Sequence, residues 1–273
     1  MGKDQQEFDS LNMLTVSILT DNTARGQFLA EHGLSYLVEI NNEKILFDAG
    51  HSDVFLKNAE KLKVDIENEI KTVVLSHGHW DHGNGLKYLK NKTLITHPDS
   101  FSKRYRKTDH TIVGLELTKN EIEKQFTLME SRDSLQLTGN LFFLGEIPRN
   151  NDFESQSTSF EFANGSDDFI PDDSALATIV NNELVVITGC SHSGICNICE
   201  HAKKVTGVDK IKAVIGGFHL KEQDKQSLKT VEYFKKSKVE KLLPSHCTAL
   251  PALALFHSSF TTEQVKTGMV FRF

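Results

Sequence analysis

The stretch 71–85 reads KTVVLSHGHWDHGNG and holds four potential metal ligands within six positions. The run Val73-Val74-Leu75 is apolar and predicts a buried strand, while Gly83 and Gly85 open a helix after the loop. Between them lies the spacing H-x-H-x-D-H, formed by His77, His79, Asp81 and His82. A strand sets the direction of the loop that follows it, so ligands two apart can converge on one cation while their neighbours reach a second. The stretch therefore predicts a two-metal site.

A single histidine in such a loop would ordinarily be interpreted as a solvated surface residue. Three histidines and one aspartate at this spacing, directly after a β-run, favour metal binding instead. Imidazole with one carboxylate suits Zn, Fe, Ni or Mn better than Ca or Mg. We therefore expect two divalent transition-metal ions, with Zn as the first candidate and Fe, Mn and Ni as alternatives.

The motif resembles the signature of the metallo-β-lactamase-fold superfamily. Within it, the chain is similar to the branch of dihydropterin-methyl-ribofuranosyl-aminobenzene-phosphate synthases. The similarity runs through LTDNTA (19–24), EHGLSYLVE (31–39), ILFDAG (45–50), TGCSHSGICNI (188–198), GGFHL (216–220) and PSHCTA (244–249). These segments lie in both halves of the chain and leave residues 99–170 uncovered. The resemblance implies an αββα sandwich and a metal-dependent enzyme.

The composition narrows the classes of partner. The 273 residues carry a net charge of −6, from 31 basic and 37 acidic side chains, so no broad basic field is available for nucleic acid. The start, MGKDQQEFDS, is polar, and no apolar run reaches membrane-spanning length, so we expect neither a signal peptide nor membrane insertion. Four cysteines without a secretory signal suggest reduced thiols in the cytoplasm. The sequence leaves the oligomeric state open.

The second half of the chain repeats the order of the first. The predicted hairpin around Asn181-Asn182-Glu183 matches that around Asn41-Asn42-Glu43 at an offset of 140 residues, with an identical turn. The strand 212–215 then matches 71–74 at an offset of 141. Hairpin turns favour Asn, so a match between the two turns alone would be weak evidence for a repeat. Two matches at nearly one offset, with a predicted helix between them in each half, indicate an internal duplication.

We therefore predict an α/β (α+β) fold, a four-layer αββα sandwich of two internally duplicated halves. Residues 1–273 form a single metallo-β-lactamase-like domain, with one half at about 12–98, an insertion at about 99–170 and the other half at about 171–273. Near the end of the chain, a helix at 226–237 is expected to bury Leu228, Val231 and Phe234.

The predicted insertion has weaker periodicity. Thr118 and Glu121 form a capping-box pattern at the start of a short helix. The polar stretch 150–173 carries four phenylalanines and predicts a partly mobile loop over the site, with a surface insertion packed on the core as an equal alternative. A solvated loop is preferred over a phosphate clamp for the basic run of Lys103, Arg104, Arg106 and Lys107.

The resemblance implies one metal position held by His77, His79 and His192 and a second held by Asp81, His82 and His246. Three protein ligands leave open positions on each ion, which is typical of catalytic sites, where a bound water becomes hydroxide near neutral pH. Asp81 is assigned a catalytic role, since its carboxylate would lie on the ion that orients the attacking hydroxide.

Four further residues are candidates around this set. Metal-bound imidazoles usually donate their second N–H to a carboxylate or carbonyl, so Asp48, at the end of a predicted strand, is assigned to that role, with a turn aspartate as the alternative. Substrate contact is a weaker prediction for Asp21, Asn22 and His32, which equally suit turn and cap roles. The pair Cys196 and Cys199, at a predicted helix start, suits packing better than redox chemistry.

His219 departs from the pattern of the resembled superfamily. Many members place a bridging carboxylate after the strand that ends here at Ile215, and this sequence has Gly216-Gly217-Phe218-His219 instead. A neutral imidazole cannot bridge two cations as a carboxylate does. We therefore expect His219 to bind one metal terminally or to act as a general acid on the leaving group.

The function that these residues favour is a metal-dependent hydrolase acting on a small anionic substrate, phosphorylated or pterin-like, through a metal-activated hydroxide. A pterin-type condensation on the same site is the alternative that the resembled branch implies. A di-iron redox protein is a rival, although such proteins favour a carboxylate where His79 stands and need a flavin partner. A non-catalytic, metal-stabilised binding protein is the remaining rival.

Overall fold

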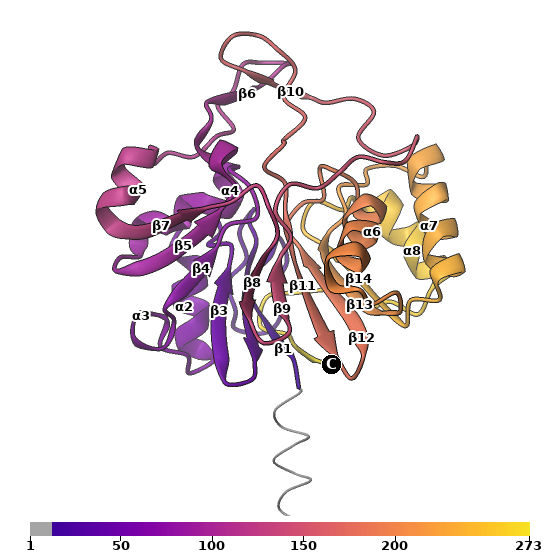
Figure 1. Ribbon diagram of the computed structural model, residues 1–273, viewed down its shortest axis with the longest axis horizontal. Helices are drawn as coiled ribbons and strands as arrows, with labels where there is room; N and C mark the ends of the chain where they lie inside the picture. The colour runs from indigo at the N-terminus through magenta and orange to yellow at the C-terminus, as the bar shows by residue number, and fades with distance from the viewer. Residues whose placement is uncertain (1–12) are drawn as a thin grey trace, which may run out of the picture.

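Two β-sheets face each other at the centre of the molecule, and helices cover their outer faces (Figure 1). The computed structural model describes residues 13–273. Side chains from both sheets form the central hydrophobic core, and a second and third core lie between each sheet and its helices. The predicted mixed α/β, four-layer αββα arrangement is confirmed.

The first sheet has the order β15-β1-β2-β3-β4-β5-β7. Its strands are β1 (Thr15–Thr20), β2 (Ser35–Ile40), β3 (Glu43–Phe47), β4 (Thr72–Val74), β5 (Lys92–Thr96), β7 (Phe126–Glu130) and β15 (Val270–Arg272). Its outer face carries α2 (Val54–Lys61), α3 (Ile66–Glu69), α4 (Trp80–Gly83), the 3-10 helices η1 (Asn84–Tyr88) and η2 (Pro98–Phe101), and α5 (Lys119–Gln125).

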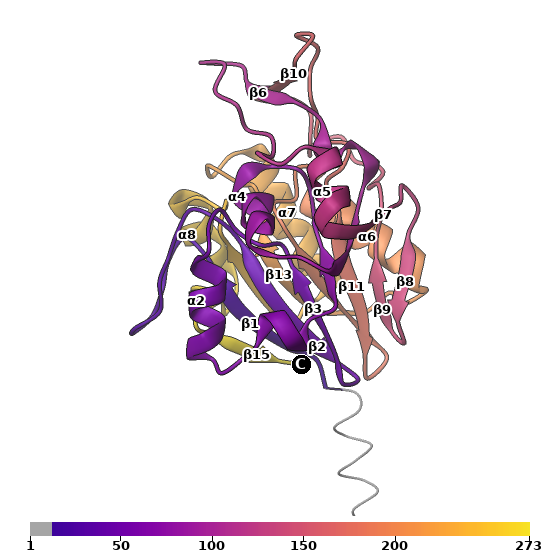
Figure 2. The ribbon, with the colours of Figure 1, turned by 90° about the vertical axis from the view of Figure 1, so that its left-hand side faces the viewer.

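The second sheet has the order β14-β13-β12-β11-β9-β8. Its strands are β8 (Leu135–Thr138), β9 (Leu141–Phe143), β11 (Ala175–Val180), β12 (Glu183–Thr188), β13 (Ile211–Gly217) and β14 (Lys241–Ser245). The helices beside it are α6 (Ile195–Thr206), α7 (Lys225–Ser237) and α8 (Leu250–Ser259). A separate two-stranded ribbon of β6 (Arg104–Arg106) and β10 (Phe160–Phe162) rises above both sheets (Figures 1 and 2).

The two halves share a topology, as the internal repeat predicts. In each, an antiparallel hairpin (β2–β3 or β11–β12) is followed by a helix and by parallel strands. Both hairpins turn through Asn-Asn pairs whose φ values are positive, 52° and 65° at Asn41 and Asn42 and 52° and 63° at Asn181 and Asn182. Two consecutive left-handed residues give the tight turn whose twist matches that of the strands, and Asn tolerates this conformation better than most residues.

The segment 99–170 is not an insertion beside the sandwich, contrary to the prediction. Its strand β7 pairs with β5 in the first sheet, and β8 and β9 pair within the second. Only the ribbon of β6 and β10 with its flanking loops stands outside the two sheets. The weak alternation of β7 and β8 hid these two strands, because each is an edge strand that is only partly buried.

The predicted buried face of the helix at 226–237 is confirmed at Val231 and Phe234 and wrong at Leu228. On α7 the buried residues are Ser227, Thr230, Val231 and Phe234, whereas Leu228 is 55% exposed. The polar residues Ser227 and Thr230 keep their hydroxyls satisfied by donating to carbonyls of Glu222 and Gln226, so they can occupy the buried face. No helix in the range 13–273 has the length and apolarity needed to cross a membrane.

Candidate metal centre

The candidate ligands meet at one edge of the sandwich, where parallel strands end. Residues 76–82 follow β4, Cys190 and His192 follow β12, His219 follows β13, and His246 follows β14. Neighbouring parallel strands end at the same edge of a sheet, so loops far apart in sequence converge there. The two sheets together thus supply one site.

Asp48 positions the loop of residues 76–82, which we call the metal loop. Its φ of 56° turns the chain at the end of β3 and leaves the side chain fully buried. One carboxylate oxygen accepts from the Ser76 N–H at 2.7 Å; the other accepts from the Ser76 hydroxyl and from His82 Nδ1, both at 2.7 Å. The Ser76 hydroxyl in turn lies 2.9 Å from His77 Nδ1, which donates to it. Asp48 therefore orients two imidazoles so that each turns Nε2 into the site.

Asp172 also positions the metal loop, through a hydrogen bond to its backbone. Its carboxylate accepts from the Gly78 N–H at 2.7 Å, and the Ser174 N–H donates to the Ser76 carbonyl at 3.0 Å. A Cβ at Gly78 would lie 1.7 Å from the Ser100 carbonyl oxygen, so only glycine fits between the loop and η2. Asp172 was not among the predicted site residues, because its role depends on contacts with distant segments.

The first cluster consists of His77, His79 and His192. Their ligand nitrogens lie within 4.8 Å of one another, and His77 Nε2 is 3.1 Å from His79 Nδ1. Burial lowers the pKa of all three rings, that of His79 to about 3, so the neutral form that binds metals is favoured. The buried Nε2 atoms of His79 and His192 have no hydrogen-bond partner. Unpartnered buried nitrogens of this kind fit a cation site.

The second cluster consists of Asp81, His82 and His246. His82 Nε2 lies 3.1 Å from His246 Nε2, and the Asp81 carboxylate is 3.4 Å from His246 Nε2 and 4.0 Å from His82 Nε2. Donors about 2.0–2.3 Å from a tetrahedral ion stand roughly 3.3–3.8 Å apart, which is close to these separations. The surrounding histidines outweigh burial and hold the pKa of Asp81 well below its usual range.

Hydrogen bonds fix the direction of both rings in this cluster. His246 Nδ1 donates to the Asn22 side-chain oxygen at 3.0 Å, while the Asn22 amide nitrogen donates to the His246 carbonyl at 3.1 Å and so sets the amide orientation. His82 Nδ1 donates to Asp48. Although burial opposes it, the carboxylates of Asp48 and Asp81 raise the pKa of His82. The two Nε2 atoms face each other at a distance that either a shared proton or a bound cation would bridge.

Cys190 belongs to the centre although the sequence analysis did not select it. Its Sγ is 3.1 Å from His82 Nε2, and the ligand atoms of Cys190, His77 and His82 lie within 4.8 Å of one another. The thiol thus lies between the two clusters. The sequence feature that could have indicated Cys190 as a donor is its place shortly after β12, two residues before His192.

The three weaker candidates take different places. Asn22 bonds His246, as described above, and lines the cavity over the site. His32 lies at the rim with a side chain 62% exposed, and its Nε2 is 3.1 Å from the Asp81 carboxylate. Asp21 is buried, does not line the cavity, and has its pKa raised to about 6 by burial.

His219 lines the site without joining a cluster. Its ring centroid is 4.3 Å from that of His192, and burial together with nearby Lys221 lowers its pKa to about 3. Among the described residues, no group of three donors within 4.8 Å contains it. A role as ligand or as general acid stays a prediction.

A cavity of about 360 Å³ opens over the clusters. Trp80 and Phe160 contribute aromatic walls, and Arg106 and Lys221 contribute positive charge at its rim. The Phe160 ring, from the ribbon strand β10, lies 4.8 Å from the His79 ring. A second cavity of about 230 Å³ adjoins it and shares Phe160 and His192. The ribbon therefore covers the candidate site, which was one of the two interpretations of 150–173.

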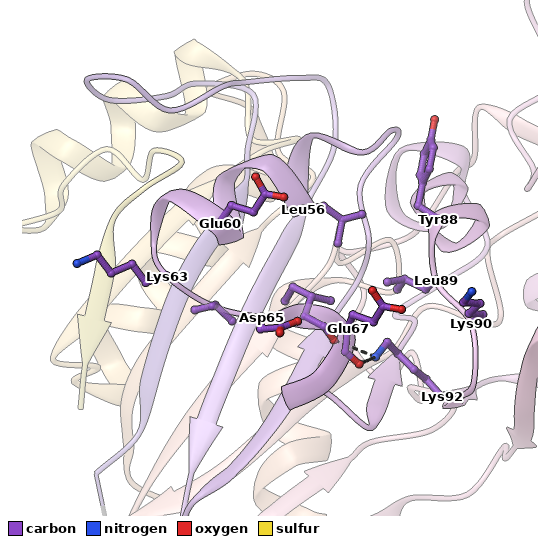
Figure 3. Close-up of a pocket in the computed structure, with 11 residues that line it drawn as sticks. Leu56, Glu60, Lys63, Asp65, Glu67, Tyr88, Leu89, Lys90 and Lys92 are labelled. Carbon is purple, nitrogen blue, oxygen red and sulfur yellow. Dashed lines mark hydrogen bonds between the residues drawn. The ribbon is translucent and has the colours of Figure 1, made fainter.

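A larger cavity, about 700 Å³, lies elsewhere, between α2, α3 and η1 (Figure 3). It contains none of the candidate ligands. Its buried cation, Lys92, donates to the carbonyls of Ile66, Glu67 and Ile70 and so closes the end of α3. We assign this cavity no catalytic role, because the convergent donors are all at the other site.

Comparisons with known proteins agree with this geometry. Residues 30–97 match the family model of the metallo-beta-lactamase superfamily. An uncharacterized protein of Methanocaldococcus jannaschii is 37% identical over 251 residues, which cover 87% of this chain and 92% of that protein. The 7,8-dihydropterin-6-methyl-4-(beta-D-ribofuranosyl)-aminobenzene-5'-phosphate synthase of the same organism is 31% identical over 271 residues, covering 90% of this chain and 91% of its own.

The fold is shared with a solved relative of similar size. Tm1679, described as a metal-dependent hydrolase of the beta-lactamase superfamily, superposes with a TM-score of 0.84 at 33% identity, covering 94% of this chain and 98% of its own. Relatives above 30% identity thus span almost the whole chain, and the family model falls on the segment that carries the metal loop. The chain belongs to the metallo-β-lactamase superfamily.

Proposed function

We propose that this protein is a dinuclear metal-dependent hydrolase acting on a small anionic substrate, phosphorylated or pterin-like. The observation that carries the proposal is the pair of adjacent donor clusters, each with imidazole nitrogens turned inward. Bound divalent ions would supply a water of lowered pKa and a Lewis acid for a substrate oxygen. Zn is the first candidate, with Fe, Mn and Ni as alternatives.

The residues of the chain have separate tasks in this proposal. His77, His79 and His192 would hold one ion, and Asp81, His82 and His246 the other. Asp48 and Asn22 keep the rings of His82 and His246 in the tautomer that binds.

Two features of the cavity favour an anionic substrate with a planar part. Arg106 and Lys221 at the rim attract negative charge in a protein whose net charge is −6. The rings of Trp80 and Phe160 offer flat apolar walls and keep bulk water away from the clusters. Four free thiols support a reducing compartment, the cytoplasm, as the place of action.

A pterin-type condensation is the second candidate. It is favoured by the relative named as a dihydropterin-linked aminobenzene-phosphate synthase, which is 31% identical over most of both chains. Both candidates use the same clusters and differ in whether water or an amine reacts with the bound substrate.

The first test measures metal content and turnover together. Protein purified without chelator should contain close to two transition-metal ions per chain and should hydrolyse a member of a panel of phosphomonoesters, phosphodiesters, lactones and β-lactams. Asp81→Ala should lose at least about a hundredfold in turnover, the scale of a lost charge-positioning group. Asp152→Ala is the matched control, because that exposed carboxylate pairs only with Lys229 on α7.

Three results would contradict the proposal. A single ion per chain, even with added Zn or Mn, excludes a dinuclear site. An Asp81→Ala variant that keeps its turnover shows that the carboxylate is misassigned. Two bound ions with no hydrolysis, but with a product joined from a pterin and an arylamine, would favour the synthase.

A further inference from the structure

A second thiol lies beside Cys190 at the metal centre. Cys247 follows His246 directly, and the ligand atoms of Cys190, His246 and Cys247 lie within 4.8 Å of one another. Both thiols line the cavity over the site. None of the predicted ligands is a thiol, so a dithiol at this point has no role in the function proposed above.

The backbone is shaped to bring these donors together. Successive side chains in an extended segment point to opposite sides, so His246 and Cys247 would ordinarily diverge. His246 instead has a φ of 48°, in the left-handed region that few residues other than glycine adopt. This turn directly after β14 directs both side chains toward the same point. Strained conformations of this kind concentrate at functional sites.

Gly217 makes the space for the second thiol. It lies in β13, paired with Ser245 of the parallel strand β14. A Cβ at this position would be 2.5 Å from Cys247 Sγ and 2.6 Å from the Gly189 carbonyl oxygen. Any larger residue would push Cys247 away from Cys190. The close packing of β12, β13 and β14 therefore holds the two thiols at the cavity floor.

We propose that Cys190 and Cys247 are both ligands of the second metal position, which then takes a thiophilic divalent ion. This inference rests on the dinuclear site proposed above, but it concerns which donors hold the second ion and does not depend on turnover. Cys190 Sγ is 3.1 Å from His82 Nε2, which ties the dithiol to that cluster. Soft thiolates select Zn, Cd or Co over Mn or Mg.

The dithiol makes the two metal positions unequal. The first has three imidazoles and keeps room for water and substrate. With two thiolates beside Asp81, His82 and His246, the second position would neutralise more of an ion's positive charge than the first. The first position would therefore supply the stronger Lewis acid for the substrate, while Asp81 at the second would keep its role in orienting the hydroxide.

The test is spectroscopic and uses the full chain reconstituted with Co(II). The wild-type protein should show thiolate-to-cobalt charge-transfer absorption in the near ultraviolet at an intensity corresponding to two thiolates. Cys190→Ser and Cys247→Ser should each lose about half of it, and the double variant should lose all of it. Cys199→Ser is the matched control, since this buried thiol lies in the core of α6 away from the cavity.

A binding measurement gives an independent readout. Cys247→Ser should weaken Cd(II) binding at the tighter site by roughly ten- to hundredfold, the range seen when even an outer partner of a ligand is removed. Its Mn(II) affinity should change little, since Mn prefers oxygen and nitrogen donors. Cys247→Ala, which adds no hydroxyl, repeats the test should the serine variant misfold.

Each contrary outcome has a distinct meaning. A wild-type spectrum with one thiolate, or a Cys247→Ser variant with unchanged absorption and Cd(II) affinity, overturns the ligand role of Cys247 and leaves the dinuclear hydrolase standing. Failure of the wild-type chain to bind a second ion of any kind overturns both. Two bound ions, one of them held by two thiolates, without turnover would support the dithiol and count against hydrolysis alone.

Discussion

Single side chains at this centre act through the orientation of their neighbours. Asp48 lines none of the three cavities described above, yet its two oxygens accept from the Ser76 N–H, the Ser76 hydroxyl and the His82 ring. Through Ser76 it also fixes the ring of His77. One buried carboxylate thus serves both metal positions, and its φ of 56° turns the chain at the end of β3 so that it can do so.

The residue most open to test is His219. His219→Ala should lower turnover or second-ion affinity sharply, because the ring lies against His192 at the edge of the cavity. Asp224→Ala should leave both unchanged, since that carboxylate caps α7 by accepting from the Ser227 N–H. Steady-state kinetics and metal titration of the two variants decide the matter. A loss confined to Asp224→Ala would mean that the acid, and not the imidazole, serves the centre.

At the scale of elements, the ribbon above the site is joined to the metal loop. Arg104, at the start of β6, is fully buried and pairs with Asp172 at 2.9 Å and with Asp168 at 3.3 Å. Asp172 in turn accepts from the Gly78 N–H, and Val113 links Arg104 to Trp80 through two backbone hydrogen bonds. The prediction of a solvated basic run is wrong for Arg104. Local sequence could not reveal the two aspartates, which lie more than sixty residues away.

The pair Arg104–Asp172 carries a prediction about stability. Asp172→Asn should lower the free energy of unfolding of the chelated protein at pH 7 by about 3–5 kcal/mol, because the buried guanidinium of Arg104 loses the closer of its two carboxylate partners. Chemical denaturation measures it. Asp109→Asn is the control, since its pair with Arg106 is exposed and worth less than about 1 kcal/mol.

The same pair predicts how the stability loss of Asp172→Asn depends on pH. Although burial opposes ionisation, Arg104 and the Gly78 N–H hold the pKa of Asp172 below its usual value. A carboxyl whose pKa is lower in the folded state stabilises the fold above its unfolded pKa, near 4, and this contribution is lost as the pH falls toward the folded pKa. The deficit of Asp172→Asn should therefore be full at neutral pH and narrow below about pH 4. A deficit that is independent of pH would show that the charge of Asp172 is not what stabilises the pair.

At the scale of the whole molecule, the metal centre joins the two halves. Asp81 and His82 come from the loop after β4 in the first sheet, whereas Cys190, His192 and His246 come from the second. Ligands contributed by both sheets are brought together only in the folded chain, so metal binding should stabilise the packing of one half on the other.

Chelation should accordingly lower the melting temperature. At a free ion concentration about a thousand times the dissociation constant, binding to the folded state alone contributes roughly 4 kcal/mol per site. Differential scanning calorimetry of the chain with and without chelator measures the loss, and added Zn should reverse it. Mg serves as the control ion, since the donor set is poor in oxygen. Equal melting temperatures for the chelated and Zn-loaded chains would refute metal binding that depends on the fold.

Much of the fold was predictable from the sequence, because its signals are local. Apolar runs ended by Gly and Asn turns predicted both hairpins, and Thr118 and Glu121 form the expected capping box of α5. The spacing from His77 to His82 predicted a cluster, and the structure brings those four side chains together with His192 and His246.

Tertiary structure alone decided the rest. Cys190 and Cys247 converge only because β12, β13 and β14 pack side by side. Arg104 can be buried only because the fold places the carboxylates of Asp168 and Asp172 next to its guanidinium. The exposed Leu228 likewise depends on which face of α7 meets its neighbours. Periodicity and spacing in a sequence reflect interactions between residues a few positions apart. These outcomes depend instead on how close distant segments come to one another, and only the complete fold of the two sheets sets that distance.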